Sequence, residues 1–187
     1  MNTALSDQKI VFDLDLIHRY DKTGPRYTSY PTAVQFTEDY GEKDYRNWAD
    51  DSNNDPIPAP LSLYLHIPFC NTICYYCACN KIVTKDYTRA AAYVQLLKKE
   101  IQLQAALFNK DRKVLQMHWG GGTPSYLNSE HITELLDCIK QHFNMADDTN
   151  GEYAIEVDPR TVDAGRIHEL RALGFNRISF GVQDFNP

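Results

Sequence analysis

The sequence lacks an excess of positive charge. Its 187 residues include 19 lysines and arginines against 25 aspartates and glutamates, which gives a net charge of −6. A protein that binds nucleic acid through phosphate contacts carries a basic patch or stripe, and the sequence shows none. The composition therefore argues against a nucleic-acid-binding function.

Long hydrophobic runs are also missing. The first ten residues, MNTALSDQKI, have no apolar core of the kind that a signal peptide needs. No stretch of the sequence approaches the roughly 18 consecutive apolar residues of a membrane-spanning helix. We therefore expect a cytoplasmic protein without a membrane span, and the chain is long enough to bury one sizeable core.

Cysteine is rare except in one short segment. Cys138 stands alone, whereas Cys70, Cys74, Cys77 and Cys79 all lie within the segment FCNTICYYCACNK. Disulfides are rare in a reducing cytosol, so clustered thiols there indicate metal or redox chemistry. Cys77 and Cys79 are also so close in sequence that a disulfide between them would be geometrically awkward.

The spacing of the clustered cysteines is C-x3-C-x2-C-x-C. Structural zinc sites usually pair two short Cys-x-x-Cys knuckles across a longer separation. A single loop that offers three thiolates to one face suits a cuboidal iron–sulfur cluster instead. The spacing therefore favours an iron–sulfur cluster but leaves structural zinc open as an alternative.

From Leu61 onward, β-compatible apolar runs alternate with segments whose apolar residues recur every three or four positions. Such alternation indicates a parallel sheet with helices outside it. Strands are expected at 61–67, 114–119, 153–157 and 175–182, and helices at 86–108, 128–143 and 161–173. Gly174 is expected to end the third helix in the usual C-terminal position.

Each expected strand is followed by residues that are unusual in a structural core. These are the cysteine segment, GGGTP, EVDPR and GVQDF, in chain order. Because function gathers at this face of β/α barrels, we expect an α/β fold with a partial (β/α) barrel over residues 61–187. Four strands cannot close a barrel and would leave an open edge, so the sequence is expected to be the N-terminal part of a longer protein. Residues 1–60 are expected to be an irregular segment ending in a linker at 49–60.

Several motifs together resemble the oxygen-independent coproporphyrinogen III oxidase family of the radical S-adenosylmethionine (SAM) superfamily. C-x3-C-x2-C resembles the signature loop of the superfamily, and the similarity covers residues 13–187. Cys79 points to this family more specifically than the three-cysteine signature does, because haem-chaperone-like relatives tend to lack it. One small departure is Ala78, which stands where some relatives carry a glycine. The motifs that carry the narrower resemblance are YTSYPTA, LYLHIPFCNTICYYCACNK, HWGGGTPSYL, IEVDPR and ISFGVQDF.

The resemblance implies a [4Fe–4S] cluster in which Cys70, Cys74 and Cys77 hold three irons and the fourth iron binds SAM. Reductive cleavage of SAM gives a 5′-deoxyadenosyl radical, which takes a hydrogen atom from a substrate propionate. Loss of carbon dioxide and one electron then leaves a vinyl group. Two propionates of coproporphyrinogen III would react in this way, consuming two SAM molecules and giving protoporphyrinogen IX for haem biosynthesis.

The resemblance also assigns site residues. Cys79 is not expected to bind the cluster and is a candidate for an accessory role. No residue is assigned a catalytic role. Asp158 and Arg160 are interpreted as a loop anchored by an ion pair outside the site, and His66 and His118 as structural histidines. Contacts to SAM are expected from Tyr64, Tyr76, Gly121, Gly122, Thr123 and Glu156, and a contact to a second SAM from Gln183.

The expected partners are coproporphyrinogen III and a low-potential electron donor such as flavodoxin or ferredoxin. The full-length protein is expected to be a monomer, and these 187 residues alone are expected to be inactive. One alternative is a haem-chaperone-like radical SAM relative. The other, from a different class, is a zinc-stabilised binding module without catalysis.

Overall fold

The computed structural model describes residues 12–22, 32–75, 77–147 and 149–181. The chain forms two compact units, Met1–Gly41 and Glu42–Pro187. The first unit contains helix α1 (Leu14–Tyr20), which begins at Asp13, and a 3-10 turn η1 (Ala33–Gln35). The Asp13 carboxylate accepts a hydrogen bond of 3.0 Å from the Leu16 amide, which satisfies one of the free amides in the first turn of the helix.

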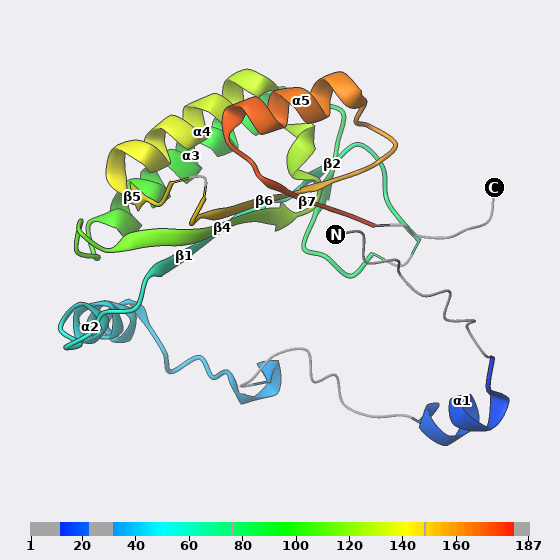
Figure 1. Ribbon diagram of the computed structural model, residues 1–187, viewed down its shortest axis with the longest axis horizontal. Helices are drawn as coiled ribbons and strands as arrows, with labels where there is room; N and C mark the ends of the chain where they lie inside the picture. Colours follow the sequence, from blue (N-terminus) through cyan, green and yellow to red (C-terminus); the bar gives the residue numbers. More distant parts are fainter. Residues whose placement is uncertain (1–11, 23–31, 76, 148, 182–187) are drawn as a thin grey trace, which may run out of the picture. The chain divides into compact units, whose positions relative to one another are not determined.

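The second unit is built on a parallel sheet whose strands follow the order β1–β4–β6–β7 (Figure 1). Each neighbouring pair in this order is parallel, which confirms the predicted α/β class. The predicted strand at 175–182 begins two residues later, at Arg177, and Val182 lies outside the described residues. The strands are β1 (Leu61–Ile67), β4 (Lys113–Gly121), β6 (Glu152–Val157) and β7 (Arg177–Phe180), with a short β5 (Asn144–Met145) beside β4.

Helices α3 (Thr88–Ala105), α4 (Ser129–His142) and α5 (Ala164–Leu173) lie along one face of the sheet (Figure 1). These are the three predicted helices, and each is shorter than its predicted range. Asn128 caps α4, since its side-chain oxygen accepts a hydrogen bond of 2.8 Å from the His131 amide.

The ends of α3 and α5 differ from the prediction by up to three residues. The Asp86 carboxylate accepts a hydrogen bond of 3.1 Å from the Thr88 amide, so α3 starts just beyond its expected first residue. Helix α5 begins three residues later than predicted, because Asp163 caps it and accepts a hydrogen bond from the Arg166 amide. Gly174 follows α5 with φ 112°, the left-handed conformation that glycine adopts most easily.

One hydrophobic core fills the space between the helices and the sheet. Trp119 on β4 and Ile155 on β6 are fully buried there, with the ring of Phe175 edge-on to Trp119 at 5.3 Å. Cys138 on α4 is buried. None of the described helices is long and apolar enough to cross a membrane.

The predicted linker at 49–60 is wrong in its first part, because helix α2 (Glu42–Asn53) occupies residues up to Asn53. The helix was not predicted because it buries only Ala49 among its residues and so shows little apolar periodicity. The buried guanidinium of Arg112 holds the end of α2 and the chain that follows it. It donates hydrogen bonds to the Ser52 hydroxyl at 2.9 Å and to the Ala59 carbonyl at 2.7 Å.

Candidate functional site

The cysteine segment forms a loop whose two ends are joined by a short parallel pair. Strand β2 (Phe69–Cys70) pairs with β3 (Ile82–Val83), an arrangement that the sequence did not predict. The Ile82 amide donates to the Pro68 carbonyl at 2.7 Å, and the Thr84 amide donates to the Cys70 carbonyl at 2.9 Å. These bonds fix the base of the loop directly after β1.

A cavity of about 950 Å³ opens beside this loop, at the carboxyl ends of β4, β6 and β7. All four clustered cysteines contribute to its walls, and so do the turn after β4 and the end of β6. The structure therefore brings together the predicted site residues that it describes, with the exception of Tyr64. The lining includes Cys70, Cys74, Cys77, Cys79, Gly121, Gly122, Thr123, Glu156, Asp158 and Arg160.

The glycine turn after β4 is bound to the chain that leads into the cysteine loop. The Gly122 amide donates to the Ile67 carbonyl at 2.8 Å, and the Thr123 amide donates to the Phe69 carbonyl at 2.8 Å. A Cβ atom on Gly122 would lie 2.6 Å from the Pro68 carbonyl oxygen, a distance that no side chain tolerates. The close approach that requires glycine at this position is therefore made to the protein's own backbone.

Glu156 is held in place by two donors while its side chain stays 40% exposed. Its Oε2 accepts a hydrogen bond of 3.3 Å from the Gly121 amide, and its Oε1 lies 3.1 Å from His118 Nε2. The carboxylate is thus oriented toward the glycine turn and retains room to accept further hydrogen bonds, as a ribose-binding carboxylate must.

Tyr64 lies next to this pair rather than in the cavity lining. Its ring stacks on the His118 ring with centroids 5.9 Å apart, and its hydroxyl lies 3.2 Å from His66 Nδ1. Burial, followed by the negative charge of Glu156 and of Cys79, raises the pKa of the Tyr64 phenol. Both histidines have hydrogen-bonding neighbours, as expected of structural histidines.

The thiols of Cys77 and Cys79 differ in their electrostatics. A hydrogen bond from the Cys79 backbone amide is the main cause that lowers the pKa of Cys77. Partial desolvation is the main cause that raises the pKa of Cys79, although this residue is exposed overall. Both thiols line the cavity, and each affects the pKa of the other.

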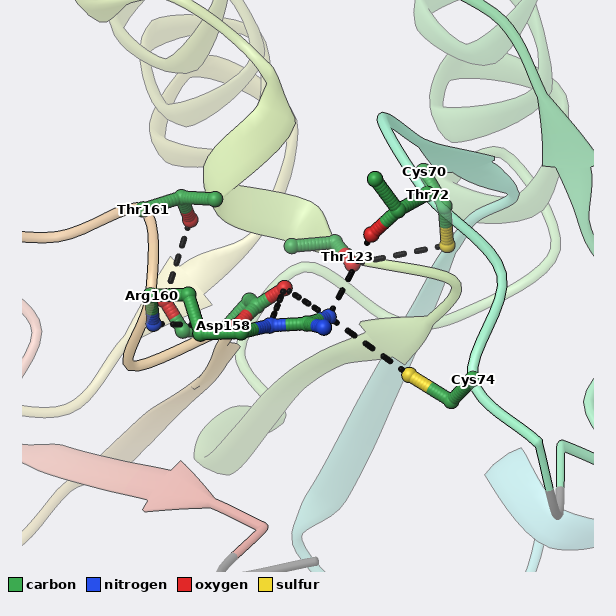
Figure 2. Close-up of polar contacts among 7 residues, drawn as sticks. All are labelled: Cys70, Thr72, Cys74, Thr123, Asp158, Arg160 and Thr161. Atoms are coloured by element: carbon green, nitrogen blue, oxygen red, sulfur yellow. Dashed lines mark hydrogen bonds and ion pairs between the residues drawn. The ribbon is translucent and has the colours of Figure 1, made fainter. Parts of the chain in front are cut away.

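Asp158 and Arg160 form the expected ion pair, with 2.7 Å between Oδ2 and Nη2. Although they were not expected in the site, both residues line the cavity. Figure 2 shows the Arg160 guanidinium extending from Asp158 toward Thr72 and Cys74. The signal that could have found them is their position directly after β6, at the edge of the sheet where the other site residues lie.

The residues present fit a cluster bound by Cys70, Cys74 and Cys77. All three thiols are free and line one cavity. The Cys70 sulfur accepts a hydrogen bond of 3.4 Å from the Thr123 hydroxyl, and such bonds commonly accompany cluster-binding sulfurs (Figure 2). Within the described ranges, no three His, Cys, Asp or Glu side chains converge to hold a single metal ion.

Two predicted contacts lie outside the described residues, namely Tyr76 within the cysteine loop and Gln183 after β7. Their contacts with SAM stay predictions. Cys79 is exposed at the rim of the cavity, and its accessory role also stays a prediction.

The sequence matches a known superfamily and proteins that share one name. Residues 64–187 match the radical SAM superfamily. The oxygen-independent coproporphyrinogen III oxidase of Pseudomonas aeruginosa is 51% identical over 177 residues, which cover 95% of this chain and 38% of that protein. A protein of the same name from Mannheimia haemolytica is 43% identical over 151 residues, 81% of this chain and 99% of that protein.

A solved structure agrees with these relatives. Coproporphyrinogen III oxidase (HemN) from Escherichia coli, described as a radical SAM enzyme, matches with a TM-score of 0.79 and 47% identity. The match covers 96% of this chain and 38% of that structure. The chain thus spans about 38% of the length of several relatives that it matches.

These matches decide between the two metal sites that the cysteine spacing left open. The radical SAM superfamily implies a [4Fe–4S] cluster and SAM, and the parallel sheet is that of a partial radical SAM barrel. The cavity is placed where a barrel enzyme of this kind has its active site, at the carboxyl ends of the strands. The chain belongs to the oxygen-independent coproporphyrinogen III oxidase family of the radical SAM superfamily.

Proposed function

We propose that the protein containing this chain oxidatively decarboxylates two propionate side chains of coproporphyrinogen III to vinyl groups. The product is protoporphyrinogen IX, so the protein would act in haem biosynthesis in the cytoplasm. The observation that carries the proposal is the single cavity that gathers the cysteine loop, the glycine turn and Glu156. The names of the relatives support the choice of substrate.

The described residues have separate roles in this proposal. Cys70, Cys74 and Cys77 would hold the [4Fe–4S] cluster from the loop whose base is fixed by β2 and β3. The turn at 121–123 and Glu156, which line the same cavity, would bind SAM.

Other contacts complete the proposed site. Tyr64 would contribute a further contact to SAM from beside His118, and Tyr76 would contribute one from the cysteine loop. Gln183 would contact a second SAM molecule, which fits the consumption of two SAM molecules per product. Cys79 remains free for an accessory role, since a cluster with an open iron needs one ligand fewer than it has irons.

When bound, the cluster and SAM supply the one-electron chemistry that removes hydrogen from each propionate. The protein's own contribution is to bind and orient these groups and to exclude competing reactions. The electron would come from a low-potential donor such as flavodoxin or ferredoxin, and the full-length protein would act as a monomer.

The proposal is tested first by metal content. After anaerobic reconstitution, we expect about four irons and four acid-labile sulfides per chain. Cys70→Ala should lose them and Cys79→Ala should keep them. Zinc that requires all four cysteines for its retention would contradict the proposal and restore the structural-metal alternative.

The second test is activity with the full-length protein, which separates the proposal from the haem-chaperone alternative. Coproporphyrinogen III, SAM and a reductant should yield protoporphyrinogen IX together with 5′-deoxyadenosine. A protein that binds haem tightly but forms no protoporphyrinogen would instead support the chaperone-like function.

A further inference from the structure

Two side chains from outside the cysteine loop contact sulfur atoms inside it (Figure 2). The Thr123 hydroxyl lies 3.4 Å from Cys70 Sγ, and Arg160 Nη2 lies 3.6 Å from Cys74 Sγ. Thr123 follows β4 and Arg160 follows β6, so the two donors come from neighbouring strands of the sheet. The two contacts differ in charge, because Arg160 brings a cation to the sulfur and Thr123 brings a neutral hydroxyl.

Arg160 is held in a defined orientation although its side chain is 58% exposed. Asp158, whose side chain is only 16% exposed, accepts hydrogen bonds from Arg160 Nη2 at 2.7 Å and from Nε at 2.9 Å. Such a two-point contact fixes the plane of a guanidinium, which a single contact would not do.

Asp158 is itself fixed by the loop that follows it. Its carbonyl accepts hydrogen bonds from the Thr161 amide at 2.9 Å and from the Thr161 hydroxyl at 3.0 Å. The pair therefore reaches the cysteine loop from a rigid base at the end of β6. The Nη2 atom that binds Asp158 also lies 3.3 Å from the Thr72 hydroxyl, between the carboxylate and the cysteine loop.

We propose that Arg160 is a positioning residue that donates a hydrogen bond to the Cys74 sulfur and thereby raises the reduction potential of the cluster. Reduction adds one negative charge to the cluster and its thiolates. A cation and a hydrogen-bond donor beside one sulfur stabilise the reduced form more than the oxidised form. The inference rests on the proposed function, because it requires the cluster.

The matched control is Arg177, which forms a similar ion pair at the other end of the same strands. Arg177 Nη1 lies 2.7 Å from Glu152 Oε1, where β6 and β7 begin. Arg177→Gln therefore removes an arginine–carboxylate pair of the same length without changing the surroundings of the cysteines.

The experiment is a redox titration of the anaerobically reconstituted full-length protein without SAM, followed by electron paramagnetic resonance of the reduced cluster. In Arg160→Gln we expect about a tenfold lower ratio of reduced to oxidised cluster at a fixed solution potential, which corresponds to about 59 mV for one electron. Arg160→Lys keeps the charge but lacks the planar fork, so it should recover part of the loss. Arg177→Gln should titrate like the wild type.

An unchanged potential in an Arg160→Gln protein with full iron and sulfide content would overturn the inference. If Arg160→Gln loses its cluster, Asp158→Asn decides the matter, because it keeps the guanidinium but removes its anchor together with one negative charge, and the loss of that charge alone would raise the potential. A lowered potential in Asp158→Asn supports the inference, and a raised one overturns it. A wild-type protein without iron and sulfide would overturn the proposed function itself, and this result appears before any titration.

Discussion

The carboxylate of Glu156 and the imidazole of His118 face each other across two neighbouring strands, with 3.1 Å between Oε1 and Nε2. The register pairs His118 with Ala154, and Glu156 is two residues further along β6, so both side chains lie on the same face of the sheet. Trp119 and Ile155, one position away on each strand, are fully buried in the core on the other face. Because successive side chains of a strand point to opposite faces, Trp119 and Ile155 pack in the core while His118 and Glu156 lie on the other face of the sheet.

The first prediction concerns Glu156→Gln, which keeps the size of the side chain but removes its charge. Hydrogen bonds to charged groups contribute about 1.5–3 kcal/mol, so the affinity for SAM should fall about tenfold or more. The measurement is calorimetric titration of SAM into the anaerobically reconstituted protein.

Glu152→Gln is the control for this substitution, because Glu152 begins the same strand and pairs with Arg177 at 2.7 Å. It should bind SAM like the wild type. An unchanged affinity in Glu156→Gln would remove Glu156 from the set of SAM contacts.

The second prediction concerns Gly122→Ala. The added Cβ would lie 2.6 Å from the Pro68 carbonyl oxygen and 2.8 Å from the Phe69 carbonyl oxygen, and neither backbone group can move without displacing β2. We expect a loss of about 1–3 kcal/mol in the free energy of unfolding, as for other overpacked sites. Because β2 begins the cysteine loop, iron content after reconstitution should also fall.

Gly165→Ala is the matched substitution on helix α5. Its Cβ would meet only Asp163 Oδ1 at 3.4 Å, an ordinary contact, and alanine favours the helix over glycine. Its stability in urea unfolding should equal or exceed that of the wild type. Equal losses in both variants would show that the contact with Pro68 is not the cause.

The strands and the three large helices could be predicted because each buries one face. The alternation along β1 and the three-and-four spacing along α4 are direct consequences of that burial. The clustering of the cysteine loop, the glycine turn and Glu156 followed from parallel topology, since all three lie at the carboxyl ends of strands that end at one edge of the sheet.

The features that sequence reasoning missed depend on contacts between distant residues. Helix α2 buries little of its own surface and is held by Arg112, which lies far along the chain. The β2–β3 pair is only two residues long on each side, too short to show a pattern. From the sequence, Arg160 is expected only in a loop ion pair outside the site, because nothing local indicates that it reaches Cys74.

The third prediction concerns Arg112→Met. Arg112 is 8% exposed and donates to Ser52, Asn53 and Ala59, so its loss removes several part-buried hydrogen bonds from a charged donor. We expect the free energy of unfolding to fall by about 2–3 kcal/mol.

Arg46→Met is the control, because Arg46 forms only an exposed pair with Glu42 on α2 and should change stability by less than about 0.5 kcal/mol. Similar losses in the two variants would contradict the proposed anchoring of α2.

The fourth prediction concerns the dependence of stability on pH at the α3–α4 contact. Lys98 on α3 donates a hydrogen bond of 3.0 Å to Glu134 on α4, and this bond is the main cause that lowers the pKa of Glu134 below its ordinary value of 4.5. A carboxyl whose pKa is lowered by folding stabilises the folded state above its unfolded pKa, and this contribution disappears as pH falls through the lowered value.

The difference in free energy of unfolding between wild type and Glu134→Gln should therefore be constant near neutral pH and shrink below about pH 4.5. Urea unfolding at several pH values between 3 and 7 measures it. In a Lys98→Met background the main cause of the lowered pKa of Glu134 is gone. There, Glu134→Gln should change the free energy of unfolding by less, and the change should depend less on pH. If the full difference persists at the acidic end, the Lys98–Glu134 contact does not provide this part of the stability.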